Sequence, residues 1–197
     1  MAKSEKIPDA TITRLSIYYR QLELLEFDGY RVVSSDKLAW LCQGNPAQVR
    51  KDLGYFGEFG IRGVGYDVIE NRDWNLGIVG VGNLGSALLQ YHNFSERGFK
   101  CVAAFDNAPH KIGKVLPSGL KVMDIRELDS ATEEFDIEIG VITTPPSAAQ
   151  AVANLFLQAN VNAILNFSPT RISVPECCLV QNIDFTVMLD ILCYKLG

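Results

Sequence analysis

Histidine and cysteine are sparse in this 197-residue chain and are poorly spaced for metal binding. No Cys-x-x-Cys pair occurs among the five cysteines, and neither histidine stands at ligand spacing from one of them. The sequence therefore predicts no metal site and no redox dithiol. We interpret the cysteines as buried free thiols in a reducing compartment, and a redox switch is the less favoured alternative.

Long apolar runs are also missing. No segment approaches the roughly 18 uninterrupted apolar residues of a membrane span, and the first residues, MAKSEKIPDATITR, lack the apolar stretch of a secretory signal. We therefore expect a soluble, cytoplasmic protein without a membrane partner. Hydrophobic residues make up 48% and charged residues 21% of the chain, which excludes a disordered tail, a collagen-like chain and a disulfide scaffold.

The chain has no overall excess of positive charge, because its net charge is −5. Residues 1–72 contain ten Lys/Arg and ten Asp/Glu, whereas residues 73–197 contain 8 and 13. A nucleic-acid role would therefore depend on a local cluster in the first part of the chain and not on bulk charge.

Three helices are expected in the first 60 residues, over 8–28, 36–42 and 46–56. Asn45 is a good N-cap and Pro46 fits the first helical position, so the third helix follows a tight turn. This arrangement is typical of a helix-turn-helix. Three-and-four spacing in the first helix predicts one apolar face, formed by Ile12, Leu15, Tyr19, Leu22 and the Leu25/Glu26 turn.

The third helix has one apolar face and one polar face. Val49, Leu53 and Phe56 form the predicted buried stripe. The opposite face carries Gln48, Lys51, Asp52 and Tyr55, with Arg50 on the flank. Lys and Arg can donate to guanine edges or phosphates, Gln can read adenine, and Tyr can reach a phosphate. On this segment alone, an ordinary solvated helix face is the simpler interpretation.

A glycine-spaced stretch follows over residues 57–68 and contains β-branched and aromatic residues. This pattern predicts a two-stranded wing with Arg62 near its tip. Together with the three helices, the wing predicts a winged-helix DNA-binding domain, in which Gln48, Arg50, Lys51, Tyr55 and Arg62 are the candidate DNA contacts.

The pattern changes after Trp74. A short apolar strand, Leu76–Val79, runs into a G-x-G-x-x-G sequence that continues as a helix over 86–91. In this motif the first glycine allows a tight turn, the second lets the backbone approach a pyrophosphate, and the third packs the helix against the strand. The motif consists of Gly80, Val81, Gly82, Asn83, Leu84 and Gly85.

A second strand, 99–105, ends at Asp106, which lies 21 residues beyond Gly85. An acidic side chain at about this distance accepts hydrogen bonds from the adenosine ribose. Its charge would repel a 2′-phosphate, which favours NAD(H) over NADP(H). The glycine motif alone could be a plain strand-helix turn, but with the strand, the helix and Asp106 it predicts dinucleotide binding.

The remaining chain alternates strands with helices, which predicts an α/β fold with a Rossmann-like, doubly wound, mainly parallel sheet. The final helix, 185–196, is too apolar for a solvated tail, so we expect it to be swapped into a dimer partner. The predicted domains are a winged helix over 1–70, a Rossmann NAD(H)-binding domain over 71–184 and the dimer-swap helix over 185–197.

A winged helix before an NAD-binding domain, in this order and at this size, resembles the Rex family of redox-sensing transcriptional repressors. The resemblance covers nearly the whole chain and rests on QVRKDLGYFG (48–57), GVGY (63–66), GVGNLG (80–85), AAFD (103–106), ILNF (164–167) and NIDF (182–185). It implies a homodimer without catalytic activity. Such a dimer holds palindromic operator DNA when free or NAD⁺-bound and releases it when NADH binds.

The resemblance also assigns roles to single residues. Phe185 would contact the nicotinamide, although from the sequence alone it could equally be a core residue at a helix start. Asp184 would pair with Arg20 in one state and with Tyr91 in the other, which makes these three residues a switch; Tyr91 would also lie at the cofactor. One departure from the family is that only Ile69 and Glu70 separate GYDV from the following NRDW. Family members usually carry an additional helical segment there.

The competing interpretation is a small NAD-dependent oxidoreductase with a helical appendage. Hydride transfer to a carbonyl generally needs a proton donor and a substrate pocket. Neither His92 nor His110 has an evident carboxylate partner, no Tyr-x-x-x-Lys pair occurs, and no separate substrate domain is present. The sequence therefore favours NADH and NAD⁺ as regulatory ligands over their use as reactants.

Overall fold

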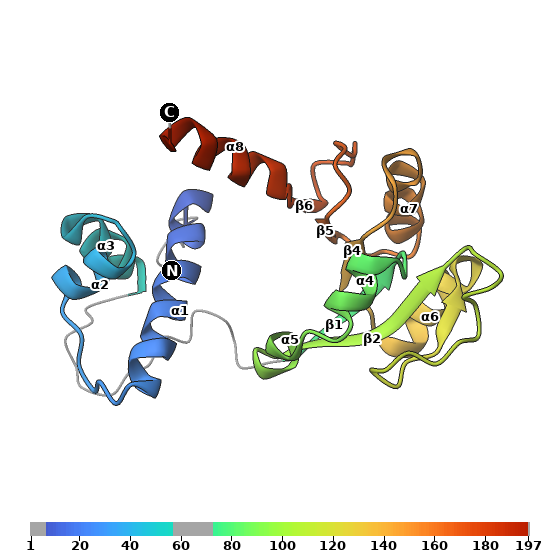
Figure 1. Ribbon diagram of the computed structural model, residues 1–197, viewed down its shortest axis with the longest axis horizontal. Coiled ribbons are helices and arrows are strands. Elements are labelled where there is room, and N and C mark those ends of the chain that lie inside the picture. The colour runs from blue at the N-terminus through green and yellow to red at the C-terminus, as the bar shows by residue number, and fades with distance from the viewer. Residues whose placement is uncertain (1–6, 57–72, 197) are drawn as a thin grey trace, which may run out of the picture. The chain divides into compact units, whose positions relative to one another are not determined.

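The computed structural model describes residues 7–56 and 73–196, which fall into two compact units, Met1–Asn71 and Arg72–Gly197 (Figure 1). In the described part, no helix has the length and apolar character needed to cross a membrane. The same part contains no group of three or more His, Cys, Asp or Glu side chains that could hold a metal ion.

The first unit contains α1 (Asp9–Phe27), α2 (Ser35–Leu41), α3 (Pro46–Leu53) and a 3₁₀ turn, η1 (Gly54–Phe56). The Ser34 side chain caps α2 by accepting from the Lys37 amide. Asn45 caps α3 by accepting from the Ala47 amide over 2.7 Å. Local capping therefore starts both helices close to where the sequence predicts them. The predicted wing, including Arg62, lies outside the described residues.

The core of this unit contains Leu15, Tyr18, Leu38, Ala39 and Val49. The predicted core face of α1 is partly wrong, because Ile12 is 49% exposed and Tyr18, instead of Tyr19, is buried. The predicted third helix is also too long, since regular α-helix ends at Leu53 and the 3₁₀ turn follows.

The second unit is a six-stranded parallel sheet in the order β3-β2-β1-β4-β5-β6, which confirms the predicted doubly wound α/β fold. The strands are β1 (Trp74–Val79), β2 (Phe99–Asp106), β3 (Val122–Asp124), β4 (Ile139–Ile142), β5 (Ala163–Asn166) and β6 (Leu179–Asn182). The helices are α4 (Asn83–Leu88), α5 (His92–Glu96), η2 (Ile125–Glu127), α6 (Leu128–Phe135), α7 (Pro146–Gln158) and α8 (Phe185–Leu196).

Both faces of the sheet are buried, as expected for a parallel sheet with helices on each side. On β2, Phe105 belongs to the core cluster beneath α6 and α7, while the adjacent Ala104 belongs to the cluster beneath α4 and α5. Gly140 on β4 has no room for a side chain, because an added Cβ would lie 2.7 Å from the Phe156 ring. The helices therefore fix the sheet from both sides.

The strand order reverses between β1 and β4, which lie side by side. Val79, at the end of β1, pairs with Phe105 of β2 and with Ile142 of β4. The loops after these three strands therefore leave the sheet at the same edge. A crevice at such a reversal is where open α/β sheets bind ligands.

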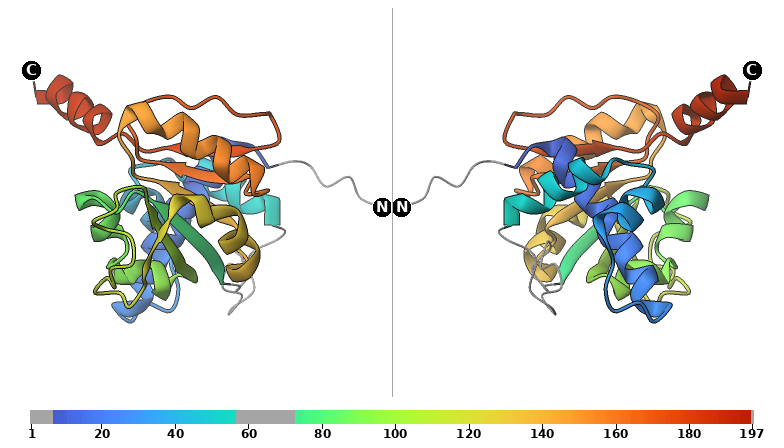
Figure 2. Two further views of the ribbon diagram at one scale, coloured as in Figure 1. Left: turned by 90° about the vertical axis from the view of Figure 1, so that its right-hand side faces the viewer. Right: turned by 90° about the vertical axis from the view of Figure 1, so that its left-hand side faces the viewer.

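Helix α8 extends away from the sheet (Figure 2) and has no buried residue. Its exposed side chains include eight large apolar ones, Phe185, Val187, Met188, Leu189, Ile191, Leu192, Tyr194 and Leu196. All five cysteines are free, but only Cys178 is buried: Cys42 and Cys101 are half-buried, and the interpretation as buried thiols is wrong for Cys177 and Cys193, which are exposed.

Candidate nucleotide-binding and DNA-binding sites

The glycine-rich turn after β1 is tightly packed at two of its three glycines. Gly80 has φ +102°, and a Cβ added there would lie 2.8 Å from the Thr143 carbonyl oxygen. A Cβ on Gly85 would lie 2.0 Å from the Gly80 carbonyl oxygen and 2.8 Å from Thr143 Oγ1. Only glycine at these positions lets α4 pack closely against the ends of β1 and β4.

The middle glycine differs from the other two, because a Cβ added to Gly82 would meet no atom within 4 Å. Gly82, Asn83 and Leu84 are exposed on this open side of the turn. The turn therefore has the shape that a pyrophosphate needs, with close packing behind it and bare backbone in front. The helix that follows is shorter than predicted: α4 ends at Leu88, and α5 begins only at His92.

Thr143, which directly follows β4, fixes the turn. Its Oγ1 can donate a hydrogen bond to either the Gly80 carbonyl (2.7 Å) or the Val79 carbonyl (3.0 Å). Thr143 was not among the residues predicted from the sequence. A hydroxyl side chain directly after a buried strand of a doubly wound sheet is the signal that could have found it.

Asp106 ends β2 and is 6% exposed. Its Oδ2 accepts from the Val81 amide (2.9 Å) and from Lys111 Nζ (2.8 Å), and its Oδ1 accepts from the Ala108 amide (2.9 Å). Burial alone would raise the pKa of this carboxyl. The hydrogen bonds from Lys111, Ala108 and Val81 outweigh burial and lower the pKa, so Asp106 is ionised at neutral pH.

These contacts separate the roles of the predicted cofactor residues. The Val81 side chain is buried in the core beneath α4, and its amide is already held by Asp106. Asp106 therefore anchors the glycine turn in addition to marking the expected ribose position. Lys111, which was not among the residues predicted from the sequence, lies directly at that position.

Two buried hydroxyls lie beyond β4 and β5. Within the described residues, Thr144 Oγ1 and Ser168 Oγ have no hydrogen-bond partner. The residues stand in equivalent positions, because each lies two residues beyond the paired Ile142 and Asn166. A buried hydroxyl without a hydrogen bond lowers the stability of the folded state, so each of these two groups marks a place where a further polar partner is expected.

Phe185 begins α8 and is 59% exposed, so it is not a core residue of its own chain. Its ring lies 6.2 Å from that of Phe167 between centroids, tilted by 36°. This pair offers an apolar aromatic surface just beyond β5. Together with the open side of the glycine-rich turn at Gly82 and the hydrogen-bonded carboxylate of Asp106, this aromatic surface fits a dinucleotide with an aromatic base at each end.

Two of the three predicted switch residues, Asp184 and Tyr91, have local partners here. Asp184 accepts hydrogen bonds from the Thr186 amide (2.9 Å) and hydroxyl (2.6 Å), and these bonds lower its pKa. Tyr91 is 49% exposed, its hydroxyl accepts from Asn93 Nδ2 (3.2 Å), and its ring meets Phe94 edge-on. Arg20 is exposed on α1 in the other unit.

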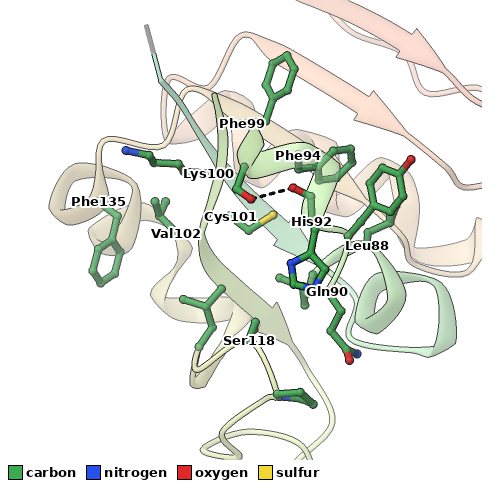
Figure 3. Close-up of a pocket in the computed structure, with 15 residues that line it drawn as sticks. Leu88, Gln90, His92, Phe94, Phe99, Lys100, Cys101, Val102, Ser118 and Phe135 are labelled. Carbon is green, nitrogen blue, oxygen red and sulfur yellow. Dashed lines mark hydrogen bonds between the residues drawn. The ribbon is translucent and has the colours of Figure 1, made fainter. Parts of the chain in front are cut away.

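Tyr91 lines a cavity of about 790 Å³ at the start of β2 (Figure 3). Phe99, in this cavity, lies seven positions along β2 from Asp106, which corresponds to roughly 23 Å, and neither Asp106 nor any residue of 80–85 lines the cavity. Burial raises the pKa of the Cys101 thiol in its wall to about 11, so this thiol is protonated at neutral pH. His92 also lines the cavity. The cavity is therefore separate from the glycine-rich turn.

The candidate DNA-contacting face of α3 is smaller than predicted. Arg50 and Lys51 are exposed, while Gln48 and Tyr55 are half-buried. Asp52 was expected on this face, but it is 0% exposed, so that prediction is wrong. The reason is a partner on α1, because Arg14 donates to both Asp52 oxygens over 2.6 and 2.8 Å.

Three further side chains donate to Asp52: Tyr18 (3.1 Å), Thr11 (3.3 Å) and Gln48 (2.8 Å). The hydrogen bonds from Arg14 hold the pKa of Asp52 down to about 2 against the opposing effect of burial. Burial and the hydrogen bond to Asp52 raise the pKa of Tyr18 to about 12. This network fixes α3 against α1 and leaves Arg50 and Lys51 pointing to solvent.

Two family descriptions match the chain, one for each unit. Residues 6–54 match the family described as "Putative DNA-binding protein N-terminus", and residues 71–170 match the family described as "CoA binding domain". The crystal structure of RSP, a Rex-family repressor, in complex with β-NAD⁺ and operator DNA matches with a TM-score of 0.87 at 30% identity, covering 98% of this chain and 93% of RSP. RSP in complex with β-NADH matches with a TM-score of 0.86 at 29% identity, covering 98% and 95%.

The chain is also 52% identical to the redox-sensing transcriptional repressor Rex of Syntrophobacter fumaroxidans (strain DSM 10017 / MPOB). The match spans 206 positions and covers 99% of this chain and 98% of the relative. Because this chain has only 197 residues, at least nine residues of the relative have no counterpart here. On this similarity, the chain belongs to the Rex family of redox-sensing transcriptional repressors.

Proposed function

We propose that this protein represses transcription according to the NADH/NAD⁺ ratio. It binds operator DNA when free or NAD⁺-bound and releases the DNA when NADH binds. The observation that carries this proposal is the combination of a glycine-rich turn, open at Gly82 and anchored by Asp106, with a rigidly held α3 that exposes Arg50 and Lys51. Its relative RSP has been crystallised with β-NAD⁺ and operator DNA, and with β-NADH.

The functional residues follow this division. Residues 1–70 form the DNA-binding domain, in which Gln48, Arg50, Lys51, Tyr55 and Arg62 contact DNA. Residues 71–184 form the NAD(H)-binding domain, in which Gly80–Gly85 and Asp106 hold the adenosine diphosphate half. Phe185 faces the nicotinamide, and this role is supported by its exposure and its ring contact with Phe167.

The polarity of the nicotinamide side favours NADH over NAD⁺. The two forms differ by a hydride and by one positive charge on the ring. The Phe167–Phe185 surface is apolar, so contact with it costs less desolvation free energy for the neutral ring of NADH than for the charged ring of NAD⁺. The ligand can shift the protein between states only through such a difference in affinity.

The protein acts as a homodimer in the cytoplasm, where it reads a palindromic operator. A two-fold dimer presents two recognition helices to successive major grooves, about 34 to 36 Å apart. Residues 185–197 provide the dimer contact by exchange between protomers. This assignment is supported by the eight large apolar side chains that α8 leaves exposed.

The dinucleotide is a signal in this proposal and not a reactant. A catalytic proton donor would have to stand near the nicotinamide. His92 instead lines the separate cavity at the start of β2, and His110 is exposed in the loop after β2. Incubation with NADH and candidate carbonyl substrates should leave the nicotinamide absorbance unchanged. Steady NADH consumption would favour the oxidoreductase alternative.

A mobility shift with a palindromic duplex tests the proposal directly. The duplex is titrated with protein and then, separately, with NADH, NAD⁺ and coenzyme A. We expect NADH to release the duplex at concentrations at which NAD⁺ does not. Coenzyme A is included because it shares the adenosine diphosphate group. Release by coenzyme A alone would assign a different ligand, and no release by any of the three would contradict ligand-controlled repression.

A further inference from the structure

The carboxylate of Asp106 has little capacity left for a ribose. An ionised carboxylate has about four acceptor positions. Three of them are taken by the amides of Val81 and Ala108 and by the Lys111 ammonium. The adenosine ribose has two neighbouring hydroxyls, so Asp106 alone cannot accept from both. A second group at this position must complete the contact.

Lys111 is available for that contact. Its Nζ has three donor positions, of which Asp106 takes one over 2.8 Å, and the side chain is 31% exposed. The backbone fixes its position, because the Lys111 amide donates to the Ala108 carbonyl (2.9 Å) and the Lys111 carbonyl accepts from Lys114 (3.1 Å). The ammonium is therefore held at the end of β2 with donors to spare.

The ion pair also changes the charge that a ligand meets. Asp106 by itself would repel a ribose 2′-phosphate, which is the basis of the predicted preference for NAD(H). The salt bridge to Lys111 brings the charge of the pair to zero, and the more exposed member of the pair is the cation. A phosphate entering from solvent would meet the ammonium before the buried carboxylate.

We propose that Lys111 is the specificity-determining residue at the adenosine ribose, where it donates to the ribose beside Asp106 and supplies the counter-charge that reduces discrimination against a 2′-phosphate. This inference rests on the proposed dinucleotide function and deepens it. The ribose is recognised by an Asp–Lys pair, so the preference between NADH and NADPH depends on both charges.

The test compares the dissociation constants of NADH and NADPH, measured by isothermal titration, for wild-type protein and four variants. Lys111→Gln should raise the ratio of the NADPH dissociation constant to the NADH dissociation constant by about tenfold, which is the effect of one lost charge contact. The NADH affinity itself should change less than about threefold. Lys111→Arg should restore the wild-type ratio. Asp106→Asn should lower this ratio, because it removes the negative charge that repels a 2′-phosphate. Lys114→Gln is the control, because it removes the same charge from an exposed side chain in the same loop.

The outcomes separate this inference from the proposed function. If wild-type protein binds neither dinucleotide, the proposed function fails. If it binds NADH but Lys111→Gln leaves the ratio unchanged, or changes it no more than Lys114→Gln does, only the role of Lys111 is overturned. If Lys111→Gln does not fold, Lys111→Met, which keeps the aliphatic stem and removes the charge, decides: an unchanged ratio in that variant overturns the proposal, and a raised ratio of the NADPH to the NADH dissociation constant supports it.

Discussion

Gln48 and Asp52 lie one turn apart on α3, and the Gln48 amide donates to Asp52 Oδ1 over 2.8 Å. Asp52 in turn accepts two hydrogen bonds from Arg14 of α1. A residue expected to read a base is therefore attached to a buried carboxylate that is fixed by another helix. This connection makes the orientation of the DNA-contacting face depend on the core of the first unit.

Replacing Asp52 with Asn should destabilise the first unit. The substitution removes the charge partner of Arg14 and leaves hydrogen-bond donors of the network without an acceptor. Breaking a buried ion pair costs about 3 to 5 kcal/mol, and because Arg14 is 34% exposed we expect roughly 2 to 3 kcal/mol. Urea unfolding followed by circular dichroism measures the loss. Asp36→Asn, an exposed acid on α2, should change the free energy of unfolding by less than about 0.5 kcal/mol.

The same carboxyl should make stability depend on acid pH. The folded-state pKa of Asp52 is lowered to about 2 from an ordinary value near 3.8. A lowered folded pKa adds stability that is complete above the unfolded pKa and is lost as the pH falls through the folded pKa. We therefore expect about 2 kcal/mol to disappear between roughly pH 5 and pH 2. The Asp52→Asn variant should lack this component, and parallel pH profiles of the two proteins would contradict the assignment.

Gly82 and Gly85 provide a matched pair of tests for the glycine-rich turn. Gly82→Ala adds a methyl group where no atom lies within 4 Å, so the fold should keep its melting temperature. NADH affinity should nevertheless fall at least about tenfold, because the methyl group occupies the side open to the pyrophosphate. Gly85→Ala forces a Cβ to 2.0 Å from the Gly80 carbonyl and should lose both binding and stability. Unchanged NADH affinity in Gly82→Ala would place the pyrophosphate elsewhere.

The elements that the sequence predicted well have strong local signals. The strand 99–105 was predicted within one residue of β2, and the helix Phe185–Leu196 was predicted with the bounds that the structure has, because a run of mainly apolar residues marks each of them. β3 was missed because three residues with one buried side chain, Val122, produce no periodicity. α6 was missed because it ends at Asp136 with a φ of 51°, where glycine is the usual signal.

The errors at the candidate sites have a different cause. Asp52 was expected in solvent because a helical pattern places charges outside, but its partner Arg14 is 38 residues away in the sequence. Lys111 was missed because its role depends on the turn that returns it to Asp106. Local patterns locate a glycine motif and the end of a strand. They do not show which distant side chains neutralise a charge.

Arg50 and Lys51 should differ in how their removal affects DNA binding. Both side chains are exposed on α3. We expect Lys51 to read a base, so Lys51→Ala should cost about 1 to 3 kcal/mol on the cognate duplex and relax specificity at one position. Arg50 should hold a phosphate, so Arg50→Ala should weaken binding to all sequences and make the salt dependence shallower by about one unit. Binding curves identical to wild type for both variants would remove α3 from the interface.

Asp184 is the proposed switch residue for the coupling between NADH and DNA. Asp184 also caps α8, since it accepts from the Thr186 amide and hydroxyl. Replacement by Asn is therefore the better test, because Asn keeps a capping oxygen while it removes the charge. We expect Asp184→Asn to bind NADH and operator DNA separately, whereas NADH should lose most of its effect on DNA affinity.

The control is Asp190→Asn, which removes the same charge from an exposed position on the same helix and should leave coupling intact. Thermodynamic linkage supplies a second measurement, because operator DNA must weaken NADH binding by the same factor by which NADH weakens DNA binding. Titration of NADH with and without saturating operator duplex measures that factor. Identical NADH affinities in the wild-type protein would mean that the two sites are independent, and the oxidoreductase alternative would then account better for a dinucleotide site in this chain.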